Sequence, residues 1–426
     1  MSRSTLFRAL ALTALALCLT GAAATAAQAA SVYVSNTVPV VPGGRSCGQP
    51  GFSSVQAGIA AAKGGTVNIC AGTYTEQIDI ASKVKLAGIG GATLAMPETP
   101  ARSESPCDTK ANEEEGPLNQ ADEISICTTG KVTMTGLTVR AVVPLETCEN
   151  GLNAIFIGGG GTLKATNVAI DGASTSIAAF KGCQHGIALR VGSASREEVG
   201  HAVLKADTIA GYEKNGPTVA GSGSTMSISN STVTGEGPSP YIAQNGIQIS
   251  FGGQGIVKGT TISGNECNAP SCGAEGAQGA GVLFYEAGAG SLISGSVMRN
   301  NDMGAYYASG SSTVPASPDV TIAKDLMEAN RFEGVALEEG RAALKSDTIE
   351  GPGRVGIALY QFEESLSSSE SSSTKMKVSG QSEAAIKVES DLQPGDKPGR
   401  FEFTNSSHTE VGAVLIDESP SFEVIF

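Results

Sequence analysis

Residues Tyr241–Asn265 read YIAQNGIQISFGGQGIVKGTTISGN and contain two short runs in which apolar and polar residues alternate. In the first run Ile247 and Ile249 point to one face, and the residues between them point to the other. The second run ends at Thr261–Ser263. Alternation every two residues is typical of β-strands, and glycine and asparagine between the runs are typical of turns. The stretch therefore predicts two short strands joined by turns.

The same unit recurs along most of the chain at intervals of roughly 20 to 40 residues, which indicates a solenoid, a propeller or an array. A propeller blade needs about four strands and roughly 40 residues, so these shorter units favour stacked coils of parallel strands. The apolar residue of a Thr-Ile-x-Gly type of motif lies at Val139, Ile170, Ile209, Val233, Ile262, Val297, Leu326, Ile349 and Val378. A glycine column before the other strand comprises Gly151, Gly186, Gly216, Gly246, Gly281, Gly304, Gly334, Gly356 and Gly412, with Ala385 in its one gap.

We therefore predict an all-β solenoid of about eleven coils, each adding about 4.8 Å to the length of a rod. The composition agrees, because 55 residues are glycine, aromatic residues are 5% and Trp is absent. One segment predicts a helix: Val55, Ile59 and Ala62 share a face, and Gly64 and Gly65 end it. This helix would cover the open end of the first coil, where strand edges would otherwise be unpaired.

The first residues have the features of a secretion signal. Arg3 and Arg8 precede the apolar segment Ala9–Leu19, and Ala27–Ala29 fits an A-x-A cleavage site. The alternative is a single membrane helix, but the apolar segment is short and ends in small residues. No later segment is long and apolar enough to span a bilayer. We expect a secreted, extracellular protein.

The division of the chain follows from these patterns. We expect a secretion signal at 1–29, an N-terminal segment with the capping helix at 30–64, and the parallel coils at 65–426. The acidic segment 97–128 breaks the strand pattern and is predicted to be a surface insertion. The serine-rich segment 363–374 is predicted to be a second one.

The cysteines support export. There are 9, and removal of Cys18 with the signal leaves an even number, which favours disulfides in an exported chain. No C-x-x-C pair is present, which argues against zinc. Cys148 and Cys183 each lie three residues before a column glycine, so stacking would bring their Cα atoms to about 4.8 Å, and we predict this bond. Sequence order suggests the further pairs Cys47–Cys70, Cys107–Cys127 and Cys267–Cys272.

The net charge is −14 at pH 7, and loss of the two signal arginines makes the chain more negative. Such a surface repels nucleic acid and anionic membranes. It would also repel an acidic polysaccharide unless calcium bridges the two.

Several segments carry a resemblance to a known family. They are Ser54–Ala62 (SVQAGIAAA), Gly65–Ile69 (GTVNI), Ala71–Glu76 (AGTYTE), Tyr212–Gly216 (YEKNG) and Ala243–Gln248 (AQNGIQ). In these segments the chain resembles the right-handed parallel β-helix proteins of the pectate lyase-like superfamily, and in particular secreted repeat proteins of actinobacteria. The resemblance implies a right-handed, single-stranded parallel β-helix with an N-terminal capping helix. It leaves the activity open, because the superfamily holds lyases, hydrolases, esterases, adhesins and non-enzymes.

The catalytic sets of such enzymes are not evident in the sequence. A pectate lyase needs stacked carboxylates that hold calcium and a basic residue that removes a proton. Positions two and four residues after each column glycine put no carboxylates on adjacent coils. The hydrolase runs Asn-Thr-Asp, Asp-Asp, Gly-His-Gly and Arg-Ile-Lys are also absent, and Gln184–Gly186 is the nearest match.

The candidate catalytic residues are Arg190, Lys214 and His185. His185 precedes a column glycine where other coils have asparagine, so a hydrogen-bonded ladder of stacked side chains is the alternative. Polar and aromatic side chains that suit sugar hydroxyls and ring faces form a predicted carbohydrate-binding groove. The alternative is an ordinary solvated face. The groove residues are Tyr212, Lys214, Tyr241, Gln244 and Gln248 with Arg190, followed by a looser stripe of Tyr285, Tyr306 and Tyr360.

A group of glutamates could gather calcium, although an acidic surface patch is the alternative, and no resident cofactor is predicted. The group comprises Glu328, Glu333, Glu338, Glu339 and Glu350.

Two functions follow. The first is a secreted rod that binds an extracellular polysaccharide or a cell-envelope component without catalysis. The second is a polysaccharide-active lyase or glycoside hydrolase with its site on the outer face of the middle coils. The missing catalytic sets favour the first.

Overall fold

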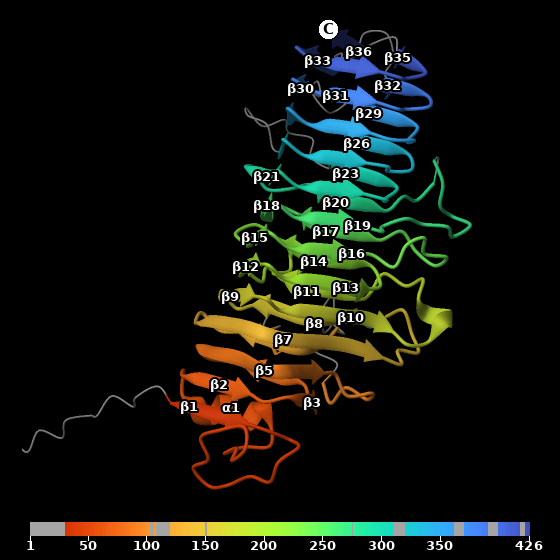
Figure 1. Cartoon of the computed structure of the whole chain (residues 1–426). Helices are drawn as coiled ribbons and strands as arrows, with labels where there is room; N and C mark the ends of the chain where they lie inside the picture. Colours follow the sequence, from red (N-terminus) through yellow and green to blue (C-terminus); the bar gives the residue numbers. More distant parts are fainter. Residues whose placement is uncertain are drawn as a thin grey trace, which may run out of the picture.

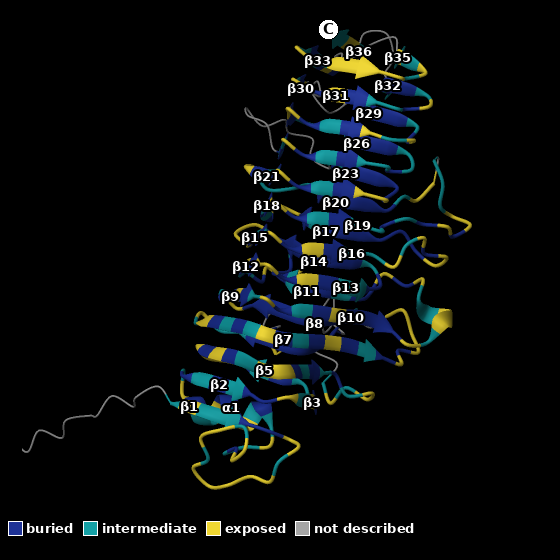
Figure 2. Ribbon diagram, in the orientation of Figure 1, coloured by how far each residue is buried: buried dark blue, intermediate teal, exposed yellow. Residues whose placement is uncertain are grey.

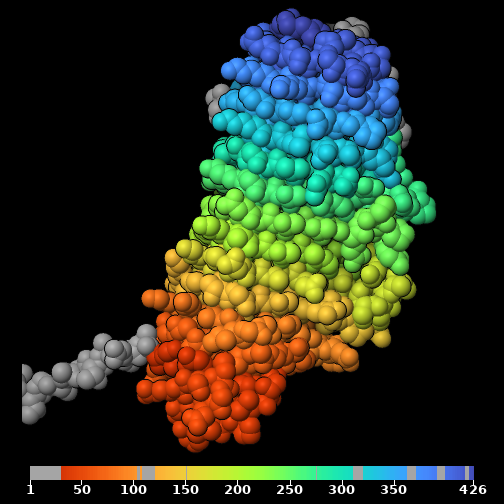
Figure 3. Space-filling model, viewed as in Figure 1, coloured from red at the N-terminus to blue at the C-terminus, as the bar shows by residue number. Residues whose placement is uncertain are grey.

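The chain folds into a rod of stacked coils that rises in sequence order from the N-terminal to the C-terminal end (Figures 1 and 3). The computed structural model describes residues 30–102, 106–107, 120–149, 151–274, 276–309, 320–361, 370–390, 399–417 and 422–426. The predicted signal at 1–29, with Cys18, lies outside the described residues. In the part of the chain that is described, no helix is long and apolar enough to cross a bilayer.

Among the described residues, one sheet contains twelve strands, one from each coil, in agreement with the prediction of about eleven coils. Its strands pair in parallel with their neighbours in the coils before and after. They are β4 (Ile78–Ile80), β6 (Gln120–Cys127), β8 (Gly151–Gly158), β11 (Ile187–Val191), β14 (Asn215–Ala220), β17 (Asn245–Ser250), β20 (Ala280–Tyr285), β23 (Met303–Ala308), β26 (Glu333–Glu338), β29 (Val355–Gln361), β32 (Ala384–Ser390) and β35 (Ala413–Asp417).

The other sheet has 24 strands in two parallel stacks, which are joined because β5 (Val84–Ala95) and β7 (Lys131–Val143) run through both. The first stack continues through β1 (Ser31–Val34), β2 (Thr66–Ile69), β9 (Gly161–Thr166), β12 (Gly200–Lys205), β15 (Thr225–Ser229), β18 (Gln254–Lys258), β21 (Ser291–Ser294), β24 (Val320–Ala323), β27 (Ala342–Lys345), β30 (Glu370–Thr374), β33 (Gly399–Thr404) and β36 (Phe422–Ile425). The second comprises β3 (Gly72–Thr75), β10 (Ala169–Thr175), β13 (Thr208–Tyr212), β16 (Thr232–Thr234), β19 (Thr261–Ser263), β22 (Val297–Arg299), β25 (Leu326–Glu328), β28 (Thr348–Glu350), β31 (Lys377–Ser379) and β34 (Ser407–Thr409).

The core runs along the axis of the rod. In the twelve-stranded sheet Ile247 aligns with Val282, and Val282 aligns with Ala305, and all three side chains are fully buried. Strands β14 and β17 of this sheet are buried along nearly their whole length, whereas strands of the other sheet, such as β7, alternate buried residues with more exposed ones (Figure 2). Burial of each aliphatic side chain contributes about 1.5–3 kcal/mol to stability relative to exposure. Each coil adds further side chains to this inward row, so the contribution grows with the number of coils.

Helix α1 (Val55–Ala62) covers the first coil and packs against β1, β2 and β4, as the sequence predicts (Figure 1). Its N-terminus is satisfied by two side chains. The Ser54 hydroxyl accepts from the Ala57 N–H at 3.2 Å, and the Glu76 carboxylate accepts from the Val55 and Gln56 N–H groups at 2.7 and 3.1 Å. A carboxylate at this end also complements the helix dipole.

All four predicted disulfides form. Their Cα–Cα distances are 5.6 Å for Cys47–Cys70, 5.0 Å for Cys107–Cys127, 5.2 Å for Cys148–Cys183 and 5.8 Å for Cys267–Cys272.

Both predicted insertions contain sheet strands. Residues 120–127 of the segment 97–128 form β6, which pairs with β4 and β8. Residues 370–374 of the segment 363–374 form β30. Most of the remainder of the two segments lies outside the described residues.

The predicted glycine column is correct in the middle of the rod and wrong near its ends. Asn215 aligns with Asn245 and with Ile187, so Ala188 rather than Gly186 continues the column that contains Gly216. Loops of unequal length before these strands shift the register by two or more residues. For the same reason Ala154 replaces Gly151, and Val414 replaces Gly412. His185 therefore does not occupy the asparagine position that the sequence suggested.

Short turns join the two stacks of the 24-stranded sheet, and several contain a buried aspartate. Asp325 accepts from the Ser296 and Ala323 N–H groups at 2.6 and 2.9 Å, and Asp347 accepts from the Asp325 and Lys345 N–H groups at 2.8 and 3.0 Å. Burial raises the pKa of each to about 7. Serine performs the same role elsewhere, since the Ser296 hydroxyl accepts from the Thr260 N–H at 3.2 Å.

These aspartates predict a rod that is more stable in mild acid. Their folded-state pKa values exceed the value of about 3.9 expected in the unfolded chain, so the folded state binds more protons between about pH 4 and pH 7. Stability is therefore lost as pH rises through this window. We expect the free energy of unfolding to be lower at pH 8 than at pH 5 by a few kcal/mol. The double variant Asp325→Ser, Asp347→Ser should reduce this difference, as measured by denaturant titration at both pH values. An unchanged or reversed pH dependence would contradict the assignment.

Candidate functional site

Three rows of side chains point outward from the twelve-stranded sheet, because its strands are parallel and in register. From β14 to β32 they stem from the first, fourth and sixth residues of each strand, and Arg190 of β11 extends the second row. The first row contains Asn215, Asn245, Ala280, Met303, Glu333, Val355 and Ala384; the second Arg190, Thr218, Gln248, Leu283, Tyr306, Ala336, Ala358 and Lys387; and the third Ala220, Ser250, Tyr285, Ala308, Glu338, Tyr360 and Glu389.

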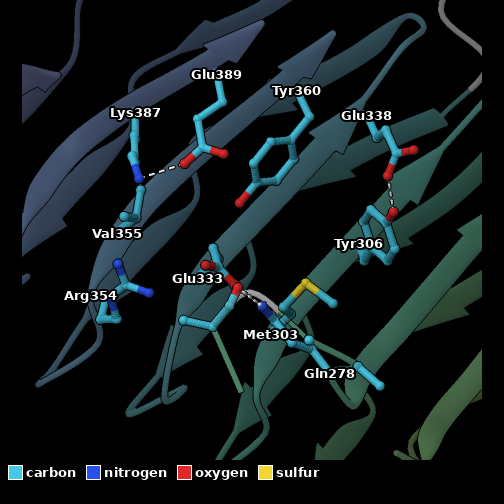
Figure 4. Close-up of a pocket in the computed structure, with 13 residues that line it drawn as sticks. Gln278, Met303, Tyr306, Glu333, Glu338, Arg354, Val355, Tyr360, Lys387 and Glu389 are labelled. Atoms are coloured by element: carbon cyan, nitrogen blue, oxygen red, sulfur yellow. Dashed lines mark hydrogen bonds and ion pairs between the residues drawn. The ribbon is translucent and has the colours of Figure 1, made fainter. Parts of the chain in front are cut away.

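A cavity of about 360 Å³ lies on this face over β23, β26, β29 and β32 (Figure 4). Ala336 and Ala358 are small and buried, which leaves room for the rings of Tyr306 and Tyr360 to pack against them. We call this cavity the Glu333 pocket. It is lined by Ala274, Gly276, Ala277, Gln278, Met303, Tyr306, Glu333, Glu338, Arg354, Val355, Tyr360, Lys387 and Glu389.

Glu333 is the unusual group of the pocket. Its side chain is 3% exposed, and burial raises its pKa to about 8, with Arg354 opposing the shift and Asp302 and Glu389 adding to it. Its Oε2 atom is buried and has no hydrogen-bond partner among the described residues. At pH 7 this carboxyl is therefore mainly protonated, and it can donate its proton to a group in the pocket.

The other ionisable groups are paired. The Tyr306 hydroxyl donates to Glu338, and the pKa of Tyr306 is raised, first by burial and then by this carboxylate. Lys387 Nζ lies 2.5 Å from a Glu389 oxygen and 3.4 Å from Glu383. Arg354 donates to the same Glu383 from Nε at 3.0 Å and from Nη2 at 2.7 Å. The cations of the pocket are thus neutralised by carboxylates.

Two residues of the predicted groove share a different cavity. Arg190 and Gln248 line a space of about 410 Å³ over β11, β14 and β17, together with Asn215 and Thr218. Tyr306 lines the Glu333 pocket instead. Tyr285 is 37% exposed and contacts Phe251 edge to face, with ring centroids 5.3 Å apart.

Two other predicted groove residues are buried in the structure. The Tyr212 side chain is in the core, and its hydroxyl donates to Asn265 at 2.6 Å. Gln244 is 1% exposed and donates to the Tyr212 and Glu213 carbonyls at 2.7 and 3.1 Å. Neither can contact a polysaccharide. The alternation of apolar and polar residues does not show which residues next to a strand are covered by the loops of neighbouring coils.

The remaining candidates lie beside the loops before β11, β14 and β17. His185 is buried, and its Nδ1 lies 3.3 Å from Glu213, whose pKa is raised by burial to about 7. Lys214 donates to the Ala243 carbonyl at 2.8 Å, and burial lowers its pKa to about 8. Tyr241 is 40% exposed, with Lys181 Nζ 5.8 Å from its ring centroid. The structure therefore does not unite the three catalytic candidates in one cavity.

The five glutamates do not converge. Glu333 and Glu338 line the pocket, whereas Glu328 and Glu350 belong to strands β25 and β28 of the other sheet. Within the described part of the chain, no cluster of three or more His, Cys, Asp or Glu side chains is arranged to hold a metal ion.

Sequence reasoning named Glu333 only as a member of an acidic group and did not place it in a pocket. It considered positions two and four residues after each glycine, whereas Glu333 directly precedes Gly334. The signal was available in the same motif of other coils, since Asn215 and Asn245 precede their glycines and also point outward.

Among the solved structures that are similar to this chain are two β-helix proteins. The catalytic domain of a GH87 alpha-1,3-glucanase in complex with nigerose aligns with a TM-score of 0.56 and 14% identity over 86% of this chain and 64% of that one. The Azotobacter vinelandii mannuronan C-5 epimerase AlgE4 A-module aligns with a TM-score of 0.51 and 13% identity over 92% of this chain and 99% of that one. At these identities the likeness concerns the fold, and the chain spans less than two thirds of the glucanase domain.

No curated protein sequence matches the chain. The family described as "Right handed beta helix region" matches residues 124–372, which is more than half of the chain. The parallel coils, the inward aliphatic rows and this match agree, and the chain belongs to the right-handed parallel β-helix family of the pectate lyase-like type.

Proposed function

We propose that the protein is a secreted glycoside hydrolase that binds a polysaccharide on the outer face of the twelve-stranded sheet and cleaves it with Glu333 as the proton donor. The observation that carries this proposal is the carboxyl side chain of Glu333, which is buried in a pocket and has one oxygen without a hydrogen-bond partner among the described residues. Burial raises its pKa to about 8. The two similar solved structures are, by name, a glucanase and a mannuronan epimerase, which is consistent with a polysaccharide substrate.

The chemistry needs a proton donor and a second carboxylate. Glu333 would give its proton to the glycosidic oxygen as the bond to the anomeric carbon breaks. A water molecule would add its hydroxyl to that carbon, and an ionised carboxylate would take up the remaining proton. Glu389 suits the second role, because it belongs to the same pocket, pairs with Lys387 at 2.5 Å and acts on Glu333 through its charge. Cleavage thus leaves a hydroxyl group on each of the two new chain ends. The proton that Glu333 gives up is matched by the proton that the second carboxylate takes from water.

The pocket also offers contacts for sugar rings. The Tyr360 side chain points into the space above Glu333, and the Tyr306 ring lies below Glu338, to which its hydroxyl donates (Figure 4). Aromatic faces pack on the apolar side of a pyranose ring, while Gln278 can bond its hydroxyls. Export suits this role, because four disulfides form in an oxidising environment.

A second candidate is polysaccharide or envelope binding without catalysis. It is favoured by the third outward row, in which Tyr360 separates Glu338 from Glu389, so that this row stacks no two carboxylates on adjacent coils. In this case the Glu333 proton would serve only as a hydrogen-bond donor to a sugar oxygen. Cleavage separates the two candidates.

The Glu333→Gln variant tests the proposed reaction. Glutamine keeps the shape and neutral charge of the protonated acid but cannot release a proton. We therefore expect retained folding and polysaccharide binding, with cleavage reduced by at least 10²-fold, the usual contribution of a general acid. Cleavage is measured as new reducing ends from a panel of neutral and acidic polysaccharides. Wild-type activity should fall as pH rises through about 8, where Glu333 loses its proton.

The matched control is Glu350→Gln, which removes an exposed glutamate from β28 on the other sheet and should leave cleavage unchanged. Wild-type binding without new reducing ends from any member of the panel would leave the non-catalytic candidate. Full activity in Glu333→Gln would remove Glu333 from the mechanism.

One wall of the pocket is a loop held at both ends by a buried aspartate. Asp302 accepts from the Cys267 N–H at 3.0 Å and from the Gly279 N–H at 2.8 Å, and Arg331 lies 2.7 Å from its other oxygen. Between these anchors the loop supplies Gln278 and three other lining residues. The loop should therefore set substrate affinity rather than the chemical step.

Asp302→Asn should loosen this wall. The amide retains one acceptor oxygen, but its NH2 group would face the Arg331 guanidinium, which is also a donor. Part of the buried hydrogen bonding is therefore lost, at a cost of about 1–3 kcal/mol. We expect the apparent Kd for an oligosaccharide to rise roughly tenfold, or about 1.4 kcal/mol, with faster hydrogen exchange in residues 268–279. The control Asp171→Asn changes an exposed aspartate on β10. Unchanged affinity with faster exchange would show that the loop is not part of the binding site.

A further inference from the structure

The second cavity on the outward face differs from the Glu333 pocket in charge. Its polar lining includes Arg190, Ser195, Asn215, Thr218 and Gln248, and no carboxylate is among the described residues that line it. The two cavities share the outward rows, and five strand pairings separate β11 from β26. At about 4.8 Å per coil, Arg190 and Glu333 are about 24 Å apart along the rod.

Arg190 is held in place but not neutralised by an adjacent carboxylate. Its Nη1 donates to Gln120 Oε1 at 2.9 Å, and its Nη2 donates to Ser193 Oγ at 3.2 Å, so two of its five N–H groups are used on neutral acceptors. The charge of Asp122 acts on Arg190, but this carboxylate accepts hydrogen bonds from Gln120, Ser125 and Asn153. Among the described residues that line the two cavities, Arg190 is the one cation without an ion pair; Arg354 pairs with Glu383, and Lys387 pairs with Glu383 and Glu389.

Beside Arg190 the cavity has a hydroxyl that lacks a partner. Thr218 aligns with Arg190 on the next coil, is 3% exposed, and its Oγ1 forms no hydrogen bond with the described residues. Leaving a buried hydroxyl unpaired costs about 1–3 kcal/mol, which a ligand that accepts its hydrogen bond would recover. The neighbouring amides of Asn215 and Gln248 bond to each other at 2.9 Å and present further polar atoms. A cation, a hydroxyl and amides, with no carboxylate among the described residues that line the cavity, suit an anion.

An aromatic pair lies between the two cavities. Phe251 lines the Arg190 cavity and is 45% exposed, and it meets Tyr285, which lies in the third row beside Ala308. Exposed rings of this kind can carry the apolar face of a sugar. They would bridge the Arg190 cavity and the Glu333 pocket beneath one extended glycan.

We infer that Arg190 and Thr218 bind an anionic substituent of the polysaccharide, a carboxylate or a sulfate ester, at a fixed distance of about 24 Å from the bond presented to Glu333. The inference rests on the proposed function, because it assumes that the polysaccharide lies along the rod from the Arg190 cavity to the Glu333 pocket. It adds that the substrate carries an anionic substituent. The enzyme would bind an acidic sugar unit in the Arg190 cavity and cleave a glycosidic bond held in the Glu333 pocket. Cleavage would then occur at a constant spacing from the acidic unit.

The binding test does not depend on catalysis. The full chain carrying Glu333→Gln is titrated calorimetrically, at low salt, with three probes: an oligogalacturonate, the same oligosaccharide with its carboxylates reduced to hydroxymethyl groups, and the reduced form after O-sulfation. We expect at least tenfold tighter binding of one or both anionic probes than of the neutral one. The better of the two identifies the anion.

Three further variants locate this preference. Arg190→Gln should abolish it while leaving the neutral affinity within twofold. Thr218→Val is close in shape and should reduce it several-fold, so it keeps the test decisive if Arg190→Gln lowers stability. Lys258→Gln removes an exposed lysine from β18 on the other sheet and should change nothing. Equal binding of all three probes, or a preference that survives both cavity variants, would overturn the inference. If the inference fails in this way but the neutral probe still binds, the proposed function is not contradicted.

Discussion

Parallel hydrogen bonding between successive coils places each outward side chain over its counterpart in the next coil, about 4.8 Å away. A site on such a rod is therefore made by varying residue size and charge along a row. Between Tyr306 and Lys387 the second outward row contains Ala336 and Ala358, and these small residues leave room for aromatic rings over the sheet. The loop over Glu333 then closes one side of the hollow. No separate domain is needed to form the pocket.

Buried acids occur at several places in the rod, but they are satisfied in different ways. Asp325 and Asp347 each accept two backbone N–H groups, so their burial is part of the turn structure. Asp302 has the same kind of role at the loop over the pocket. Glu333 retains a buried oxygen without a partner among the described residues, although polar groups in protein interiors are normally bonded. This difference identifies it as a group that interacts with a ligand.

Much of the fold could be predicted from the sequence, because strand alternation, turn residues and cysteine order are local signals. The register was wrong at Gly186, where Ala188 occupies the column, because a loop of different length precedes that strand and loop lengths do not fix alignment. The site was harder to predict. Tyrosine is amphipathic and occurs both on sugar-binding surfaces and in cores. Tyr212 is buried because later coils cover it, and its hydroxyl donates to Asn265. Burial raises the pKa of Glu333, and the pocket around it includes Gln278 and neighbouring loop residues that lie far from it in sequence.

The central claim is that Glu333 holds a proton at neutral pH, and the most direct measurement is its titration. Infrared difference spectra of wild-type protein against Glu333→Gln, recorded from pH 5 to pH 10, isolate the carbonyl stretch of this one protonated carboxyl. We expect a band that is present at pH 7 and disappears with a midpoint near pH 8. A carboxyl that is already ionised at pH 6 would contradict the claim and remove the proton donor from the pocket.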